Sequence, residues 1–399
     1  MKLLMLFGLC ALAVANIRIP SHQWLDEVVP ERNSLDIKDS SFQSGREYKF
    51  VYDGQLATGI PGSSQQHSAI RMQAVCILQF GTSQTVTMKL THIRIGKLNT
   101  QLPKPKKMFP FTACEEVHIE QDLLGKLTSP VRFTYSRGLI TDVVFDGSEE
   151  PWSANIKRGV MNMLQVNLQK QDRIDSVETN DLSNDRDTIM NLKDGQVDSF
   201  GVSEKSIEGE CDTYYTVTSQ HCRRCDRSTP VLNVTKSINF EKCRRRPHIK
   251  YNYRFQELCP SCEKKFNDKE KILKSSTVHR YNITGDYNSF MIESCKVDSR
   301  YTFVPFDEQS DVVTSYVKQW LRLVKTGSIT TQIGQPRSPI NSDSNMIYTP
   351  DWDIAKERFF MDGDDEFGRI PPYSQIENKV QFFKSIMTKL CNYVQREID

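Results

Sequence analysis

Residues 146–165, DGSEEPWSANIKRGVMNMLQ, mark an abrupt change of pattern in the chain and decide its predicted architecture. Within this stretch apolar side chains recur at the spacing of a helix, and polar side chains fill the positions between them. Ser153 stands where a capping residue is expected, so the pattern predicts an amphipathic helix over about residues 153–169. The side chains of its predicted buried stripe are Ile156, Val160, Met163 and Leu164.

The segment before this helix, residues 46–145, has a period of two. Alternation of apolar and polar side chains is typical of half-buried antiparallel strands. Closing so many strands into a barrel would remove their exposed edges, so we predict a β-barrel whose wall buries the helix. The last two alternating runs flank a short turn and predict a hairpin. The runs are residues 48–52, 70–80, 86–90, 131–135 and 139–145.

Beyond the helix the chain returns to strand-like runs and ends in a second amphipathic segment. A length of 399 residues is too great for one ordinary core, so two or three domains are expected. Polar stretches at residues 171–210 and 326–350 predict long loops. Residues 376–394 carry apolar side chains on one side and predict a helix. The strand-like runs are residues 213–218, 230–240, 249–255 and 289–297.

The first 15 residues have the pattern of a secretory signal peptide: Lys2, then an apolar run, then small residues at a cleavage site after Ala15. A membrane anchor is the rival interpretation. The apolar run is too short for that, and no later stretch approaches the roughly 20 apolar residues that a span requires. Cleavage would leave 399 − 15 = 384 residues, and we expect a secreted, extracellular protein that is not integral to a membrane.

Charge and cysteine content agree with this expectation. The chain has 52 basic and 50 acidic side chains, a balance that argues against a nucleic-acid-binding protein. Loss of Cys10 with the signal peptide would leave ten of the 11 cysteines, and an even count in an oxidising compartment favours disulfides. Asn233 and Asn282 begin glycosylation sequons, although such triplets also arise by chance.

Two Cys-x-x-Cys pairs leave an alternative open, because four thiolates can bind zinc. Secretion weakens that interpretation and favours disulfides. The sequence lacks the Gly-x-Ser-x-Gly, phosphate-loop and His-Glu-x-x-His motifs, so we predict neither an enzyme nor a bound cofactor. The four cysteines are Cys222, Cys225, Cys259 and Cys262.

A cluster of basic side chains follows the run at 230–240. Charged side chains on a protein surface usually serve solvation. The functional alternative is a patch that recognises acidic partners, such as a glycosaminoglycan or the acidic modules of a lipoprotein-type receptor. The candidate residues are Lys242, Arg244, Arg245, Arg246, His248 and Lys250, with Arg223 and Arg224 as further members if the cysteines draw the two segments together.

Residues 146–165 resemble the signature of the vitellogenin N-terminal domain, which large lipid transfer proteins such as apolipoprotein B, apolipophorins and the microsomal triglyceride transfer protein large subunit share. Residues 208–215 and 303–306, with 312–324, resemble further landmarks of that family. The resemblance extends from about Ser44 to the end of the chain. Residues 52–54 with 58–61 favour the vitellogenin branch.

This resemblance implies a fold that is mainly β with α: an N-terminal β-barrel around a central helix, then the start of an α-helical solenoid. The expected parts are a barrel at 16–307, a connecting segment and linker at 308–350, and an acidic loop with the first helices of the helical domain at 351–399. The resemblance also implies disulfides Cys211–Cys243 and Cys259–Cys262. The partners of Cys76, Cys114, Cys295 and Cys391 stay open, with Cys76–Cys114 and Cys295–Cys391 as the remaining combination.

By resemblance, the chain is expected to serve lipid transport and yolk storage as a receptor-facing N-terminal module. Its partner would be a lipoprotein-type endocytic receptor or a glycosaminoglycan, and the family's lipid-holding portion would lie beyond this chain. The alternative is a stand-alone secreted interaction protein without bulk lipid cargo. A stop codon after Asp399 would favour the alternative, and a continued reading frame would favour the first function.

Overall fold

The computed structural model describes residues 40–61, 66–101, 108–169, 172–176, 196–220, 231–244, 273–303, 312–342 and 345–349. All of them belong to one compact unit. The predicted signal peptide, the strand-like run at 249–255 and the terminal helix at 376–394 lie outside the described residues.

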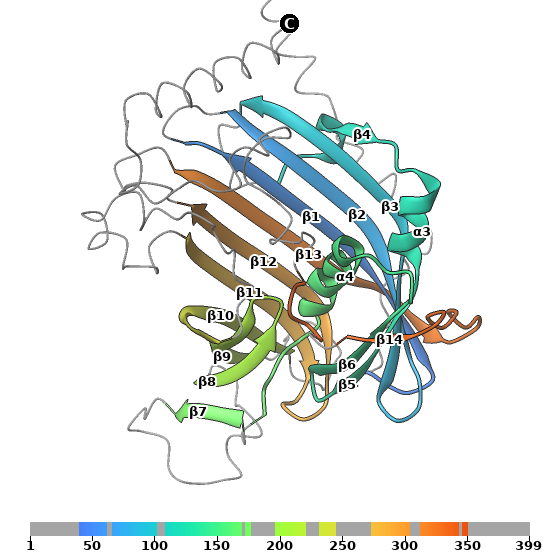
Figure 1. The fold of residues 1–399 in the computed structure, drawn as a ribbon. Coiled ribbons are helices and arrows are strands. Elements are labelled where there is room, and N and C mark those ends of the chain that lie inside the picture. Colours follow the sequence, from blue (N-terminus) through green and yellow to red (C-terminus); the bar gives the residue numbers. More distant parts are fainter. Residues whose placement is uncertain are drawn as a thin grey trace, which may run out of the picture. The chain divides into compact units, whose positions relative to one another are not determined.

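A single antiparallel sheet of 14 strands dominates this unit (Figure 1). Its hydrogen-bonded order is β14-β6-β5-β3-β2-β1-β13-β12-β11-β10-β9-β8-β7, and β4 pairs with β3 beside this path. The first strands are β1 (Arg46–Gly59), β2 (Gln66–Phe80), β3 (Thr85–Gln101), β4 (Glu115–Val117), β5 (Val131–Ser136), β6 (Leu139–Phe145) and β7 (Arg173–Ser176). The later strands are β8 (Val197–Ser206), β9 (Gly209–Gln220), β10 (Val231–Arg244), β11 (Leu273–Gly285), β12 (Phe290–Phe303), β13 (Val313–Ser328) and β14 (Ile340–Asn341).

The runs with a period of two form the strands predicted from them. In β1, for example, Tyr48, Phe50 and Tyr52 are buried while the residues between them are half-buried. The predicted hairpin is β5–β6, and Arg137 and Gly138 at its turn both have positive φ, 48° and 85°. Strand burial therefore follows the alternation of the sequence, as expected for a sheet with one face on a core.

Within the described residues the sheet is open, because β14 and β7 stand at its two ends and do not pair with each other. The predicted backbone closure into a barrel is therefore not what these strands form. The inward face is covered instead by helix α4 (Pro151–Asn162), which lies in front of the sheet in Figure 1. Tyr135 on β5 and Lys236 and Tyr281 on β10 and β11 all donate to the segment after this helix, so strands on opposite sides of the middle of the sheet are linked through it.

Helix α4 is shorter than the predicted helix and begins at a different residue. Glu150 occupies the cap position, and Pro151 takes the first helical position, which suits its fixed φ and missing N–H group. The prediction of Ser153 as the cap was wrong: this residue lies inside the first turn, and its buried Oγ has no hydrogen-bond partner among the described atoms. After Asn162 the chain turns and continues to residue 169 as a buried, non-helical segment.

Other segments also differ from the predictions. The stretch 171–210 contains β7 and β8, because Val202, Glu204 and Ser206 alternate inward even though the stretch is polar overall. The predicted boundary after residue 307 falls inside the sheet, because β13 pairs with both β1 and β12. Two short helices were also missed: η1 (Phe111–Ala113) and α3 (Gln121–Thr128).

Candidate functional site

The interior of the sheet is filled by helix α4 and the segment that follows it. Val160, Met163 and Leu164 are at most 1% exposed, and Ile156 is partly buried against the same core. The predicted apolar stripe thus faces the sheet. The surrounding core contains large aromatic side chains from several strands, among them Tyr48, Phe50, Phe133, Phe200, Tyr215 and Tyr281.

An ion pair buried beneath helix α4 was not predicted. Lys236 on β10 and Glu204 on β8 are 0% and 1% exposed, and their side chains are in direct hydrogen-bond contact. The Glu204 carboxylate also accepts hydrogen bonds from Tyr215 OH and from Gln165 Nε2, the latter at 2.7 Å. Both ions therefore have several partners, as a buried pair requires. A charged residue at an inward position of an alternating run was the available sequence signal.

The same groups satisfy backbone carbonyl groups of the non-helical segment that directly follows helix α4. Lys236 Nζ and Tyr281 OH each donate to the Gln165 carbonyl at 3.1 Å. Tyr135 OH donates to the Leu164 carbonyl, also at 3.1 Å. Side chains from β10, β11 and β5 thus converge on two carbonyl groups, and this polar centre fixes the end of the helix within the sheet.

A second buried pair fixes the start of the helix. Lys157 Nζ lies 2.6 Å from the Glu149 carboxylate, and the two side chains are 1% and 3% exposed. The same ammonium donates to the Ser129 hydroxyl and to the Lys126 carbonyl, which belong to α3 and its C-terminal cap. Burial lowers the pKa of Lys157, while the Glu149 charge acts in the opposite direction.

Arg158 joins helix α4 to the last described segment, residues 345–349. Its guanidinium donates to the Asn345 carbonyl at 2.8 Å and to the Ser342 hydroxyl, and it lies 4.9 Å from the centre of the Phe145 ring. Burial lowers the pKa of Arg158 to about 10. The segment that follows the sheet is therefore anchored back onto the helix.

His279 lies at the centre of this interior and has a strongly lowered pKa. It is completely buried, its Nε2 lies 3.2 Å from Asn162 Nδ2, and its ring stacks on Tyr281 with the centroids 6.0 Å apart. Burial, followed by the nearby Lys236 charge, holds the pKa of His279 well below its usual range. The folded protein therefore keeps this imidazole neutral.

The structure contains the Cys211–Cys243 disulfide that the resemblance implied, between register partners on β9 and β10. Cys76, Cys114 and Cys295 are free thiols, so among the pairings that the sequence left open the structure does not contain Cys76–Cys114. Cys76 faces the core on β2, whereas Cys114 packs beside Gly96 outside β3, and the sheet separates them. Cys222, Cys225, Cys259, Cys262 and Cys391 lie outside the described residues.

Only two residues of the predicted basic cluster are described. Lys242 and Arg244 are exposed at the end of β10, next to the disulfide, and Lys242 lies 3.7 Å from the Asp212 carboxylate. The structure therefore supports an exposed position for these two cations beside Cys243. The other predicted members, Arg223, Arg224, Arg245, Arg246, His248 and Lys250, lie outside the described residues.

The two sequon asparagines are register partners. Asn233 on β10 lies opposite Asn282 on β11, and both alternate with buried neighbours, so they stand on the outward face of the sheet. Asn282 is exposed and Asn233 is half-buried. Two positions that are 49 residues apart in the sequence (282 − 233) are thus neighbours on one surface.

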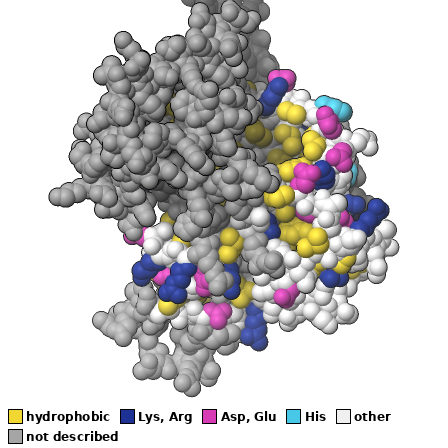
Figure 2. All heavy atoms as spheres, in the orientation of Figure 1, with side chains coloured by type: hydrophobic (Ala, Val, Ile, Leu, Met, Phe, Trp, Pro, Cys, Tyr) yellow, Lys and Arg dark blue, Asp and Glu magenta, His cyan; other side chains and the backbone are white. Residues whose placement is uncertain are grey.

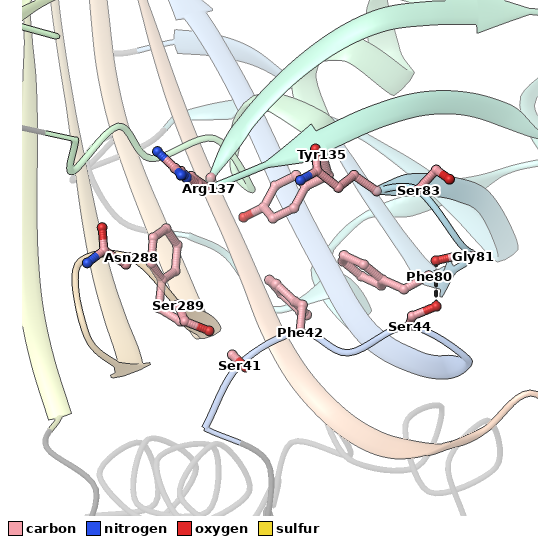
Figure 3. A pocket seen from close by; sticks show the side chains of 13 residues that line it. Ser41, Phe42, Ser44, Phe80, Gly81, Ser83, Tyr135, Arg137, Asn288 and Ser289 are labelled. Carbon is pink, nitrogen blue, oxygen red and sulfur yellow. Dashed lines mark hydrogen bonds between the residues drawn. The ribbon is translucent and has the colours of Figure 1, made fainter. Parts of the chain in front are cut away.

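A pocket of about 200 Å³ opens where the turns β2–β3, β5–β6 and β11–β12 meet the chain before β1 (Figure 3). Phe42 stacks on Phe80 with the ring centroids 4.7 Å apart, and Ser44 Oγ donates to the Gly81 carbonyl at 2.8 Å. Tyr135 approaches the same pair of rings edge-on. These contacts attach the segment before β1 to the end of the sheet.

Within the part of the chain that the structure describes, no cluster of three His, Cys, Asp or Glu side chains is placed to hold a metal ion. Among the same residues, no helix is long and apolar enough to cross a membrane. The four cysteines of the zinc alternative lie outside this part.

Comparison with known proteins places these features in a family. A family model for the vitellogenin N-terminal domain matches residues 42–331. Vitellogenin-6 of Caenorhabditis elegans is 32% identical over 398 residues, which cover 99% of this chain and 22% of that protein. Vitellogenin-6 of Oscheius tipulae is 34% identical over 340 residues, 84% of this chain and 19% of that protein. The chain thus spans about a fifth of the length of the curated relatives it matches.

A solved structure described as "Lipid-protein interactions in lipovitellin" matches 77% of this chain and 28% of that chain. The TM-score is 0.58 and the sequence identity is 21%, so this likeness concerns the fold. The fold of the described unit is accordingly mainly β and lipovitellin-like.

Proposed function

The chain belongs to the vitellogenin N-terminal domain family, and from this we propose that it works as the N-terminal module of a yolk protein that transports lipid and stores nutrients. The observation that carries the proposal is the match to C. elegans Vitellogenin-6 along 99% of the chain. The proposed role is binding and carrying rather than catalysis.

The packed interior supports a separation between partner recognition by this unit and lipid carriage by other parts of the protein. The inward face of the described sheet meets helix α4 and a polar centre of side chains, with Val160 and Lys236 both 0% exposed. Bulk lipid needs long apolar walls that are not already occupied by protein. We therefore assign recognition and scaffolding to this unit, and we place bulk lipid in other parts of the carrier.

The finer features of the predicted fold are part of the same proposal. The sheet curves around helix α4 through contacts from both of its halves, which supports a barrel-like N-terminal domain. Residues 351–399, which carry the amphipathic pattern at 376–394, are proposed to begin an α-helical solenoid. We also propose that the protein is secreted after removal of residues 1–15 and that Asn233 and Asn282 are glycosylated.

Uptake by a lipoprotein-type receptor is proposed to use the basic cluster at residues 242–250, with Arg223 and Arg224. Lys242 and Arg244 support this because both are exposed beside the Cys211–Cys243 disulfide, which fixes the ends of two strands. Acidic modules on a receptor would complement this charge, and the attraction would weaken as salt rises.

The yolk role is tested by following the native protein with an antibody raised against the 399-residue chain. The antigen should float at lipoprotein density in a gradient of the animal's body fluid, with extractable lipid, and it should accumulate in oocytes. Antigen at the density of lipid-free protein and absent from oocytes would contradict the proposed function.

The receptor-facing part is tested separately by oocyte uptake of the fluorescently labelled chain. Replacement of Arg244, Arg245 and Arg246 by Ala should reduce uptake without unfolding the sheet. The matched control removes three lysines elsewhere, Lys89, Lys97 and Lys205, and should leave uptake unchanged. Equal uptake of both variants would refute the assignment of this cluster.

A further inference from the structure

The outward face of β11, β12 and β13 has an excess of positive charge. These three adjacent strands carry seven Lys and Arg residues and two Asp and Glu residues, 7 − 2 = +5. The neighbouring strands β8, β9 and β10 carry four basic and five acidic residues, 4 − 5 = −1. We call the first surface the β11–β13 outer face. Its cations are Lys274, Arg280, Lys296, Arg300, Lys318, Arg322 and Lys325.

The strand alternation fixes the direction of these side chains. On β11, Thr277, His279 and Tyr281 are buried, so the residues between them point away from the core. On β12, Cys295 and Val297 are buried, and Lys296 between them is exposed. Because strands lie about 4.8 Å apart and outward residues recur about every 6.8 Å along a strand, the cations form a dense array.

A shallow depression of about 230 Å³ lies within this array. Arg280, Arg300 and Lys318, one from each strand, stand around it, and Val278 and Tyr316 contribute to its lining. Asp298 lies among them and pairs with Arg280 at 2.7 Å and with Lys318. One carboxylate thus orders two of the cations but offsets only one charge, and these two remain 56% and 26% exposed.

Two aromatic rings belong to the same face. Trp320 is 41% exposed, and the Lys296 ammonium lies 4.9 Å from the centre of its ring. The Arg300 guanidinium lies 5.8 Å from the centre of the Tyr316 ring. Among the described residues neither Lys296 nor Arg300 has a carboxylate partner, so cation–π contacts orient both cations while leaving them available to a ligand anion.

This combination suits one chemical class of ligand. Sulfate groups pair with Lys and Arg, and the apolar C–H face of a pyranose ring packs on Trp or Tyr. A protein partner of standard size would bury roughly 800 Å² of this surface around an apolar centre, whereas a dense array of cations surrounds the apolar side chains here. A linear sulfated sugar chain needs no such centre.

We propose that the β11–β13 outer face binds a sulfated glycosaminoglycan, with sulfates at Arg280, Arg300 and Lys318 and sugar rings against Tyr316 and Trp320. The inference deepens the proposed extracellular recognition role and rests on it, but it uses a surface distinct from the basic cluster at 242–250. On the described surface that Figure 2 leaves uncovered, Lys and Arg side chains lie beside Asp and Glu.

The test measures binding of the full chain to immobilised heparin over a series of salt concentrations. Replacement of Lys296 and Arg300 by Ala should weaken binding roughly two- to tenfold. It should also reduce the slope of log affinity against log salt by about two, because two fewer cations displace counterions. Replacing Lys97 and Lys205, two exposed lysines on β3 and β8, with Ala removes the same charge and should change neither quantity.

Two further arms separate charge from sugar recognition. Trp320→Ala should weaken heparin binding without altering the salt slope, because the ring carries no charge. Desulfated heparin should bind weakly to every variant. Equal heparin binding by the Lys296/Arg300 variant and its control would overturn the proposal, as would equally tight binding of single-stranded DNA with no effect of Trp320→Ala. If the Lys296/Arg300 variant binds heparin as its control does while the Arg244–Arg246 variant loses oocyte uptake, the proposed function stands and this inference fails.

Discussion

Replacement of Lys236 by Met tests whether the polar centre under helix α4 holds the helix in the sheet. The Lys236 ammonium is 0% exposed and has two acceptors, the Glu204 carboxylate and the Gln165 carbonyl. Methionine has a similar length but offers no charge. The Gln165 carbonyl would keep its bond from Tyr281, whereas the Glu204 carboxylate, 1% exposed, would lose its counter-ion.

The expected magnitude follows from the charge left behind. Removing one partner of a buried pair costs about 3–5 kcal/mol, because the other ion stays desolvated. Two remaining donors to Glu204, Tyr215 OH and Gln165 Nε2, place the estimate toward the lower end of that range. Adding Glu204→Gln to Lys236→Met should recover part of the loss, since no buried charge would remain.

Urea unfolding followed by tryptophan fluorescence measures these differences. The control is Lys242→Met, where the side chain is 59% exposed and the expected change is within about 0.5 kcal/mol. If the free energy of unfolding of Lys236→Met lies within about 1 kcal/mol of that of the unmodified chain, the buried pair does not hold the helix in the sheet.

Four further changes have defined outcomes. Burial holds the pKa of His279 low, so the stability that the neutral imidazole contributes is present above the unfolded-state pKa of about 6.5. As the pH falls below that value, the free energy of unfolding should decrease by up to about 1.4 kcal/mol per pH unit. Urea midpoints at several pH values should show this decrease, and His279→Gln should make it smaller. Val160→Asp should abolish secretion, because a carboxylate would enter the core at a cost of several kcal/mol; normal secretion would show that this side chain faces water. Replacing Cys211 and Cys243 with Ser should cost about 3–4 kcal/mol for a bridge with a separation of 32 residues, and an unchanged urea midpoint would contradict that stabilisation. Gly138→Ala should destabilise by more than about 1 kcal/mol, because φ is 85° and the added Cβ would lie 2.1 Å from the Val166 carbonyl oxygen; equal stability would mean that the turn relaxes freely.

The sequence predicted the element and its buried positions correctly where a single periodicity runs through a segment. The alternation at Tyr48, Phe50 and Tyr52 gave the correct inward face of β1. Val160 of the predicted stripe is buried as expected, but the polar side of α4 is buried too, because Lys157 and Arg158 find hydrogen-bond partners there. Sheet closure could not be predicted in this way, because it depends on whether the end strands meet. The order from β14 to β7 shows that they do not pair within the described residues.

Long-range contacts explain the other failures. Beyond the end of the helix at Asn162, the Leu164 and Gln165 carbonyls accept hydrogen bonds from Tyr135, Lys236 and Tyr281, which are distant in the sequence and which a local helical pattern does not reveal. The β11–β13 outer face was missed for a similar reason: its cations are spaced two or more residues apart, so no single segment looks basic. The cluster near Arg244 was predicted instead, because its basic residues are close together in the sequence.

The most direct test of the central account is the lipid content of the secreted chain, residues 16–399. Helix α4 and its polar centre fill the inward face of the sheet, and we propose that this chain recognises partners while bulk lipid lies elsewhere in the carrier. Lipid extraction with native mass analysis of the purified protein should find no stoichiometric bulk lipid. Tens of lipid molecules per chain would contradict the account, because the sheet would then enclose cargo rather than protein.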